Sequence, residues 1–230
     1  MHFAKQLLHE TSLSMTDVAL AAGFGSVRRF NETFRNLYRR PPSELRRRQS
    51  NHATAIELHA AYQPPYDWDA MLRYLEARAI DGVEEVTTGV YRRTMQLAGV
   101  NGWLEVSNHS ARHGLRVRIS FPGVAQLPEI MQRVRQVFDL SADIDQIRAH
   151  LARDSALAPL VSGRPGLRAP GGWDTFELGV RAVLGNRLRS ARRERWPRGW
   201  YGSVRASRWL RARVSSGMFF PMHARWPKRI

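Results

Sequence analysis

Residues 26–40 carry polar side chains whose types suit the edges of DNA bases. A guanidinium can donate two hydrogen bonds to guanine, an asparagine amide can pair with adenine, and a glutamate can accept from cytosine. Four side chains are predicted to face bases: Arg28, Arg29, Asn31 and Glu32. A second set is predicted to meet phosphates, which sets affinity rather than sequence preference. Its members are Arg35, Arg39, Arg40, Arg46, Arg47 and Arg48.

Two short helices are needed to present these side chains to a groove. The stretch "SLSMTDVALAAGFGS" predicts a helix capped by Ser14 and ended by Gly23, and Ser26 can cap a second helix. The second helix has an apolar face at helical spacing, formed by Val27, Phe30, Phe34, Leu37 and Tyr38. Such a pair is typical of a helix-turn-helix that reads the major groove. A solvated basic face on an ordinary three-helix unit is the alternative.

The middle of the chain predicts a small α+β domain over residues 62–139, after a helix-turn-helix domain over residues 1–50. The segment "YDWDAMLRYLEARAI" has the spacing of an amphipathic helix, and "LRVRISF" alternates apolar and polar residues as a half-buried strand does. Residues 51–61 are predicted to be a polar linker. Residues 140–186 predict helices joined by the Gly/Pro-rich "SGRPGLRAPGG".

The net charge of +16 suggests a polyanionic partner, but the charge is unevenly spread. Residues 1–50 hold 9 basic and 4 acidic groups, residues 51–186 hold 14 and 15, and residues 187–230 hold 13 basic groups and one acid. The absence of cysteine excludes disulfides and thiolate metal sites. Because no apolar run is long enough to span a membrane, we expect a soluble, cytoplasmic, nucleoid-associated protein without a membrane partner.

No metal, small-molecule cofactor or catalytic site is predicted from the remaining polar residues. The pairs Asp67/Asp69 and Asp143/Asp145 are spaced by two residues and do not share a helix face, so they are interpreted as N-terminal helix charges. His109 and His113 have helical spacing but fall in a predicted turn, where no third ligand is near. Trp103 is predicted to pack in the sheet.

Residues 3–47 resemble the second helix-turn-helix of AraC-family regulators. The resemblance rests on "DVALAAGF", on Phe30 and Phe34, and on "PPSELR". It implies that the four base-facing residues named above occupy reading positions, that Phe24 is a core residue, and that RNA polymerase is a possible partner. The family joins two such units by a helix, and this chain is expected to start at that helix. A lone unit is then expected to bind weakly, with Kd about 10⁻⁴ to 10⁻⁶ M.

Residues 61–185 resemble the N-terminal half of the inducible 3-methyladenine DNA glycosylases. The resemblance is carried by "AYQPPYDWDAMLRYLEARAIDGVEEVTTGVYRRTM" and "RPGLRAPGGWDTFELGVRAVLG". It implies a TBP-like α+β domain, then a partial helix-hairpin-helix domain over residues 140–186. In the family, base excision depends on an Asp after a G-x-G hairpin, and the resemblance stops before that region. We therefore expect an inactive glycosylase half with no catalytic residue.

Residues 187–230 have three interpretations. They could form a basic arm that binds nucleic acid, with Trp196, Trp200, Trp209 and Trp226 stacking on bases. They could continue the helical domain, although Pro197, Gly199, Gly202 and Gly217 interrupt the pattern. The favoured interpretation is a disordered, out-of-frame product of GC-rich codons. The whole chain is then predicted to be a DNA-binding regulator linked to repair of alkylated DNA. The alternatives are an active 3-methyladenine glycosylase and a non-functional product.

Overall fold

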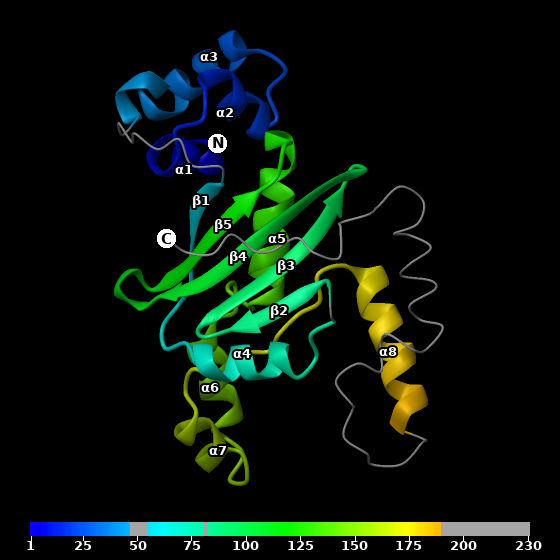
Figure 1. Cartoon of the computed structure of the whole chain (residues 1–230). Coiled ribbons are helices and arrows are strands. Elements are labelled where there is room, and N and C mark those ends of the chain that lie inside the picture. The colour runs from blue at the N-terminus through cyan, green and yellow to red at the C-terminus, as the bar shows by residue number, and fades with distance from the viewer. Residues whose placement is uncertain (47–54, 81, 190–230) are drawn as a thin grey trace.

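The computed structural model describes residues 1–46, 55–80 and 82–189 (Figure 1). Side chains are described through residue 183. The interpretations of Arg47, Arg48 and residues 190–230 therefore lie outside the described residues. The described parts are a helical unit followed by a sheet domain and three further helices, which is the predicted α+β class.

Residues 1–46 form the predicted helix-turn-helix unit. Its helices are α1 (His2–Glu10), α2 (Met15–Ala21) and α3 (Val27–Tyr38), followed by the 3-10 turn η1 (Pro42–Leu45). Ser14 caps α2 by accepting from the Asp17 amide, and Ser26 caps α3 by accepting from the Arg29 amide. Gly23 has φ of 83°, which gives it the left-handed conformation that ends α2. Local capping therefore sets where α2 ends and where α3 begins.

The sheet domain has five antiparallel strands in the order β1-β5-β4-β3-β2. They are β1 (Ile56–Ala61), β2 (Glu84–Thr87), β3 (Val90–Leu97), β4 (Val100–His109) and β5 (Gly114–Ser120). One face packs on α5 (Leu127–Val137), which follows the short turn η3 (Val124–Gln126), while α4 (Trp68–Glu76) lies near β2 (Figure 1). The core between sheet and helix contains Leu104, Val106, Leu115, Val117, Ile119, Ile130 and Val134.

The linker prediction was wrong at its C-terminal end. Residues 56–61 form the edge strand β1 instead of a polar connector. Leu58 and Ala60 are buried, and the strand pairs with β5, which lies more than fifty residues along the chain. Glu57 and His59 belong to the opposite face of the sheet, so the strand carries the apolar–polar alternation of a half-buried strand, which the linker prediction overlooked.

Three helices follow the sheet: α6 (Ile144–Leu151), α7 (Ala158–Gly163) and α8 (Thr175–Arg189). The backbone of α8 continues past residue 186, where the domain was predicted to end. Charged contacts hold α8 against the sheet. Glu177 accepts from Arg93 at 2.8 Å, and Arg181 donates to Glu84 at 2.6 Å. Arg93 is only 3% exposed and lies over the ring of Trp173, 4.3 Å from its centroid.

The helix-turn-helix unit contacts the sheet domain at two places. At the first, α1 meets the free edge of β1: Glu10 accepts from the backbone N–H of His59 at 2.9 Å, and Gln6 donates to the His59 carbonyl at 2.7 Å. At the second, α2 packs beside η3. Figure 1 shows α3 on the side of the unit that is away from the sheet. Docking on the sheet therefore leaves the predicted reading helix accessible.

Candidate nucleic-acid interface

Two buried phenylalanines hold α3 in its place. Phe30 and Phe34 are both 0% exposed. Phe24, from the turn before α3, contacts Phe30 edge-on with ring centroids 5.5 Å apart, and Tyr38 packs on Phe34 at 4.6 Å. Phe24 is thus packed against the core, as the AraC resemblance implied. The aromatic row fixes which face of α3 turns outward.

The first turn of α3 concentrates positive charge. Arg28 and Arg29 are exposed there, and the turn contains no acidic residue. The partial positive charge of a helix N-terminus favours acidic side chains, so two arginines at this end are unfavourable for the isolated helix. An anionic or acceptor-rich partner would relieve that cost. The N-terminal residues of a recognition helix are also those that meet base edges in the major groove.

Two of the four predicted base-facing residues contact each other. Arg28 Nε donates to Glu32 Oε1 at 3.1 Å, and their side chains are 88% and 58% exposed. Arg29 is exposed one position further on, and no ion pair joins it to another residue in the described ranges. Asn31 is half-buried on the adjoining face. The spacing of Arg28 and Glu32 was present in the sequence, but the prediction treated the two side chains as separate readers.

The predicted phosphate contacts divide into two groups. Arg35, Arg39 and Arg40 are exposed at the C-terminal end of α3, where Arg39 adopts a left-handed conformation with φ of 57°. Arg46 is half-buried, and its Nη2 donates to the carbonyl of Leu13. That bond ties the segment after η1 to the loop before α2, so the contact that the structure gives Arg46 is a structural one.

The remaining polar candidates have structural roles. Asp67 caps α4 by accepting from the Ala70 amide, and Asp143 caps α6 by accepting from the Gln146 amide, which confirms their interpretation as helix-end charges. His113 is exposed in the turn between β4 and β5, whereas His109 is the last residue of β4 rather than a loop residue. Within the described ranges no three His, Asp or Glu side chains are grouped closely enough to hold a metal ion.

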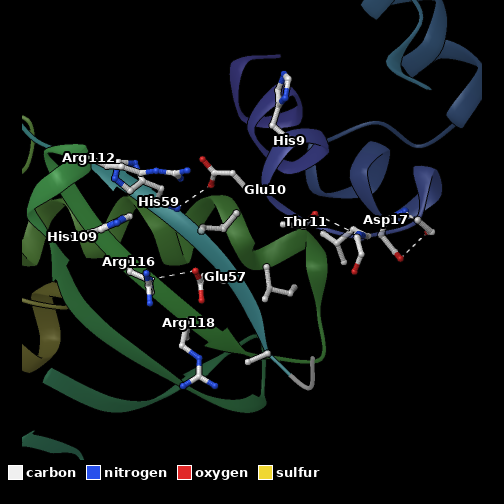
Figure 2. Close-up of a pocket in the computed structure, with 16 residues that line it drawn as sticks. His9, Glu10, Thr11, Asp17, Glu57, His59, His109, Arg112, Arg116 and Arg118 are labelled. Carbon is white, nitrogen blue, oxygen red and sulfur yellow. Dashed lines mark hydrogen bonds and ion pairs between the residues drawn. The ribbon is translucent and has the colours of Figure 1, made fainter. Parts of the chain in front are cut away.

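A cleft of about 940 Å³ separates the end of α1 from the outer face of the sheet (Figure 2). Its walls carry both signs of charge, among them Glu10, Glu57, Arg112 and Arg116. Burial lowers the pKa of His59 below its ordinary value of 6.5, and Glu10 opposes that shift only in part. Since Arg116 pairs with Glu57 at 3.4 Å, the opposite charges offset each other. The cleft is thus a junction between the two units rather than a surface of one sign.

The comparisons with known proteins divide the chain at the same place as the structure. Residues 1–48 match the family described as helix-turn-helix domain. Residues 56–174, more than half of the chain, match the family described as AlkA N-terminal domain. The chain belongs to the AlkA N-terminal domain family. The predicted union of an AraC-type helix-turn-helix with the N-terminal part of an AlkA-type protein is confirmed.

Two curated relatives are a bifunctional protein and a glycosylase. The chain is 34% identical over 195 residues to the probable bifunctional transcriptional activator/DNA repair enzyme AlkA of Mycobacterium tuberculosis. The matched residues make up 82% of this chain and 39% of that protein. It is 37% identical over 124 residues to DNA-3-methyladenine glycosylase 2 of Escherichia coli, over 54% of this chain and 42% of that one. The chain thus spans about two fifths of the length of these relatives.

The helices can be compared with membrane spans by their length and apolar character. Across the portion of the chain that the structure describes, none of them combines the length and apolar character needed to cross a bilayer.

Proposed function

We propose that the protein is a sequence-specific DNA-binding regulator of the AraC type that serves the cell's response to alkylated DNA, and that it acts in the cytoplasm at the nucleoid. The exposed, acid-free and basic first turn of α3 is the observation that carries the proposal. Arg28, Arg29 and Asn31 face bases, with Glu32 beside them. The link to alkylation repair rests on the AlkA N-terminal domain and on the bifunctional mycobacterial relative.

Phosphate contacts supply most of the affinity in this arrangement. Arg35, Arg39 and Arg40 lie further along the same exposed helix and its end, where they can follow the DNA backbone. The mycobacterial relative is named as an activator, so RNA polymerase is the proposed protein partner.

Selection from a randomised double-stranded DNA library tests the proposal. The wild-type chain should enrich a motif, and Arg29→Ala should weaken the preference at one base pair by about 1–3 kcal/mol. Arg35→Ala is the matched control, since it removes the same charge from the same helix. It should weaken binding to all sequences about equally and reduce the salt dependence. A library that stays random after selection with the wild-type chain would overturn the proposal.

An alkylbase glycosylase is the second candidate, because the chain resembles DNA-3-methyladenine glycosylase 2 of Escherichia coli. The carboxylate that α8 contributes within the described residues is already engaged in ion pairs. Glu177 accepts from Arg93 and Arg181, and these arginines lower its pKa although burial alone would raise it. We therefore expect no release of 3-methyladenine from methylated DNA by the purified chain. Release above a no-protein control would establish the second candidate.

A third alternative is a product without a stable fold. A cooperative thermal transition of the purified chain, followed by circular dichroism, would exclude it. The continuous core shared by the sheet and α5 leads us to expect such a transition.

A further inference from the structure

In the described helices, the ion pairs between residues three or four positions apart have the acidic residue first, with one exception. In α5, α6 and α8 the acid precedes the arginine: Glu129 pairs with Arg133, Asp145 with Arg148, and Glu177 with Arg181. This order is the one that stabilises a helix, since it places the negative charge nearer the N-terminus. In α3 the order is reversed, with Arg28 in the first turn and Glu32 one turn later.

The reversed pair is poorly suited to stabilising α3. Both side chains are largely exposed, so water screens their attraction. Arg28 also lies at the positive end of the helix, where an arginine is least favourable. The pair therefore calls for an explanation outside the isolated helix, at the surface that the reading helix presents to DNA.

The atoms that form the pair indicate what it does. Glu32 Oε1 bonds the Nε atom of Arg28, and no other bond to the Arg28 guanidinium occurs within the described ranges. A guanidinium is planar and rigid, so a bond at Nε restricts the orientations that the whole group can adopt. The two terminal amino groups then remain free, side by side, in the arrangement that binds O6 and N7 of guanine.

We infer that Glu32 is a positioning residue: it holds the Arg28 guanidinium so that its two terminal amino groups read one guanine in the major groove. This inference rests on the proposed DNA-binding function. It replaces the expectation that Glu32 itself accepts from cytosine. Holding Arg28 in advance also lowers the side-chain entropy lost on binding. Arg29, which lacks such a partner in the described ranges, reads DNA without this support.

Selection from a randomised double-stranded DNA library, followed by sequencing, tests the inference. The wild-type chain should show guanine at one position, and Arg28→Ala should reduce that preference about 5- to 150-fold. Glu32→Gln, which keeps the size but weakens the pair, should reduce the preference at the same position about 2- to 5-fold. In the Arg28→Ala background, Glu32→Gln should have no further effect at that position.

Two control variants separate positioning from general effects. Glu129→Gln weakens an ion pair of the same spacing in α5 and should leave the motif unchanged. Arg29→Ala should weaken a different base pair, and Glu32→Gln should not alter that one. Loss of the negative charge at residue 32 should also leave non-specific affinity equal or higher, because DNA phosphates repel a carboxylate.

Three results would overturn the inference. A motif that survives Glu32→Gln unchanged would reduce the pair to a surface contact, and a loss at a base pair other than that of Arg28 would make Glu32 a reader itself. Both outcomes leave the proposed function intact, since the wild-type motif is still present. The absence of any wild-type motif would overturn the proposed function together with the inference. Because residues 28 and 32 are exposed, circular dichroism should show all variants folded.

Discussion

The contact between α1 and β1 makes a quantitative prediction about how the two units unfold. Glu10 accepts from the His59 amide and from Gln6, whose amide also donates to the His59 carbonyl. Glu10→Ala removes the carboxylate that accepts from the His59 N–H at the junction. Loss of a hydrogen bond to a charged group costs about 1–3 kcal/mol. We therefore expect Glu10→Ala to lower the free energy of unfolding by that amount and to uncouple the helix-turn-helix unit from the sheet.

The chain offers a matched control on the same strand. Glu57→Ala also removes a carboxylate that lines the cleft, but its partner Arg116 is 3.4 Å away and both side chains are about half exposed. Such a pair contributes at most about 1 kcal/mol. Glu57→Ala should therefore keep the two units coupled, so that a difference between the two variants reports the bond to the His59 backbone.

Urea unfolding followed by two probes measures both effects. Far-UV circular dichroism reports all helices, whereas tryptophan fluorescence reports only residues outside the helix-turn-helix unit, since residues 1–46 contain no Trp. The two midpoints should coincide for the wild-type chain and for Glu57→Ala, and separate for Glu10→Ala. If Glu10→Ala had the same free energy of unfolding as Glu57→Ala and its two midpoints also coincided, the bond to His59 would not couple the two units, and the reasoning would be refuted.

Three further substitutions test the packing and electrostatics of the same molecule. Phe34→Ala empties a fully buried position under α3 and should destabilise the helix-turn-helix unit by about 3–5 kcal/mol, measured as a loss of helical signal and of DNA binding at 25 °C. The pKa of His59 is lowered by burial, so the folded state resists its protonation; stability should be full above the unfolded pKa of about 6.5 and fall as the pH drops below it. Urea midpoints at pH 7.5 and 5.5 check this, and His59→Asn should flatten the difference. Glu177→Gln weakens the partner of the buried Arg93 and should cost up to about 3 kcal/mol, with faster hydrogen exchange confined to α8 and the adjoining end of β3 as the diagnostic result.

The helix-turn-helix could be predicted from the sequence because its determinants are local. Ser14 and Ser26 each cap a helix, and each accepts a hydrogen bond from the backbone amide three residues later. Gly23 supplies the left-handed conformation between the two helices. The apolar face of α3 repeats at helical spacing, which marks Phe30 and Phe34 as buried without any knowledge of their partners.

Features that depend on distant partners could not be predicted in this way. The pairing of β1 with β5 is such a feature, because the short sequence of β1, in which Glu57 and His59 alternate with apolar residues, does not identify its partner. Arg46 was assigned to DNA by its charge, whereas its bond to Leu13 depends on the path of the chain after α3. The Arg28–Glu32 pair is an intermediate case: its spacing is visible in the sequence, but which nitrogen forms the bond is a matter of geometry.

The junction with the sheet also explains how the helix-turn-helix unit can be fused to this domain while α3 stays accessible. An edge strand exposes unpaired backbone groups that invite other strands to pair with it. Here Gln6 and Glu10, one turn apart on α1, satisfy both the N–H and the carbonyl of His59 on the free edge of β1. The helix that protects the edge thereby fixes the orientation of the whole unit, and α3 lies on its opposite side (Figure 1). The DNA that we propose α3 binds would therefore not compete with the sheet for the same surface, and the contacts at β1 and η3 can hold the two units together while DNA is bound.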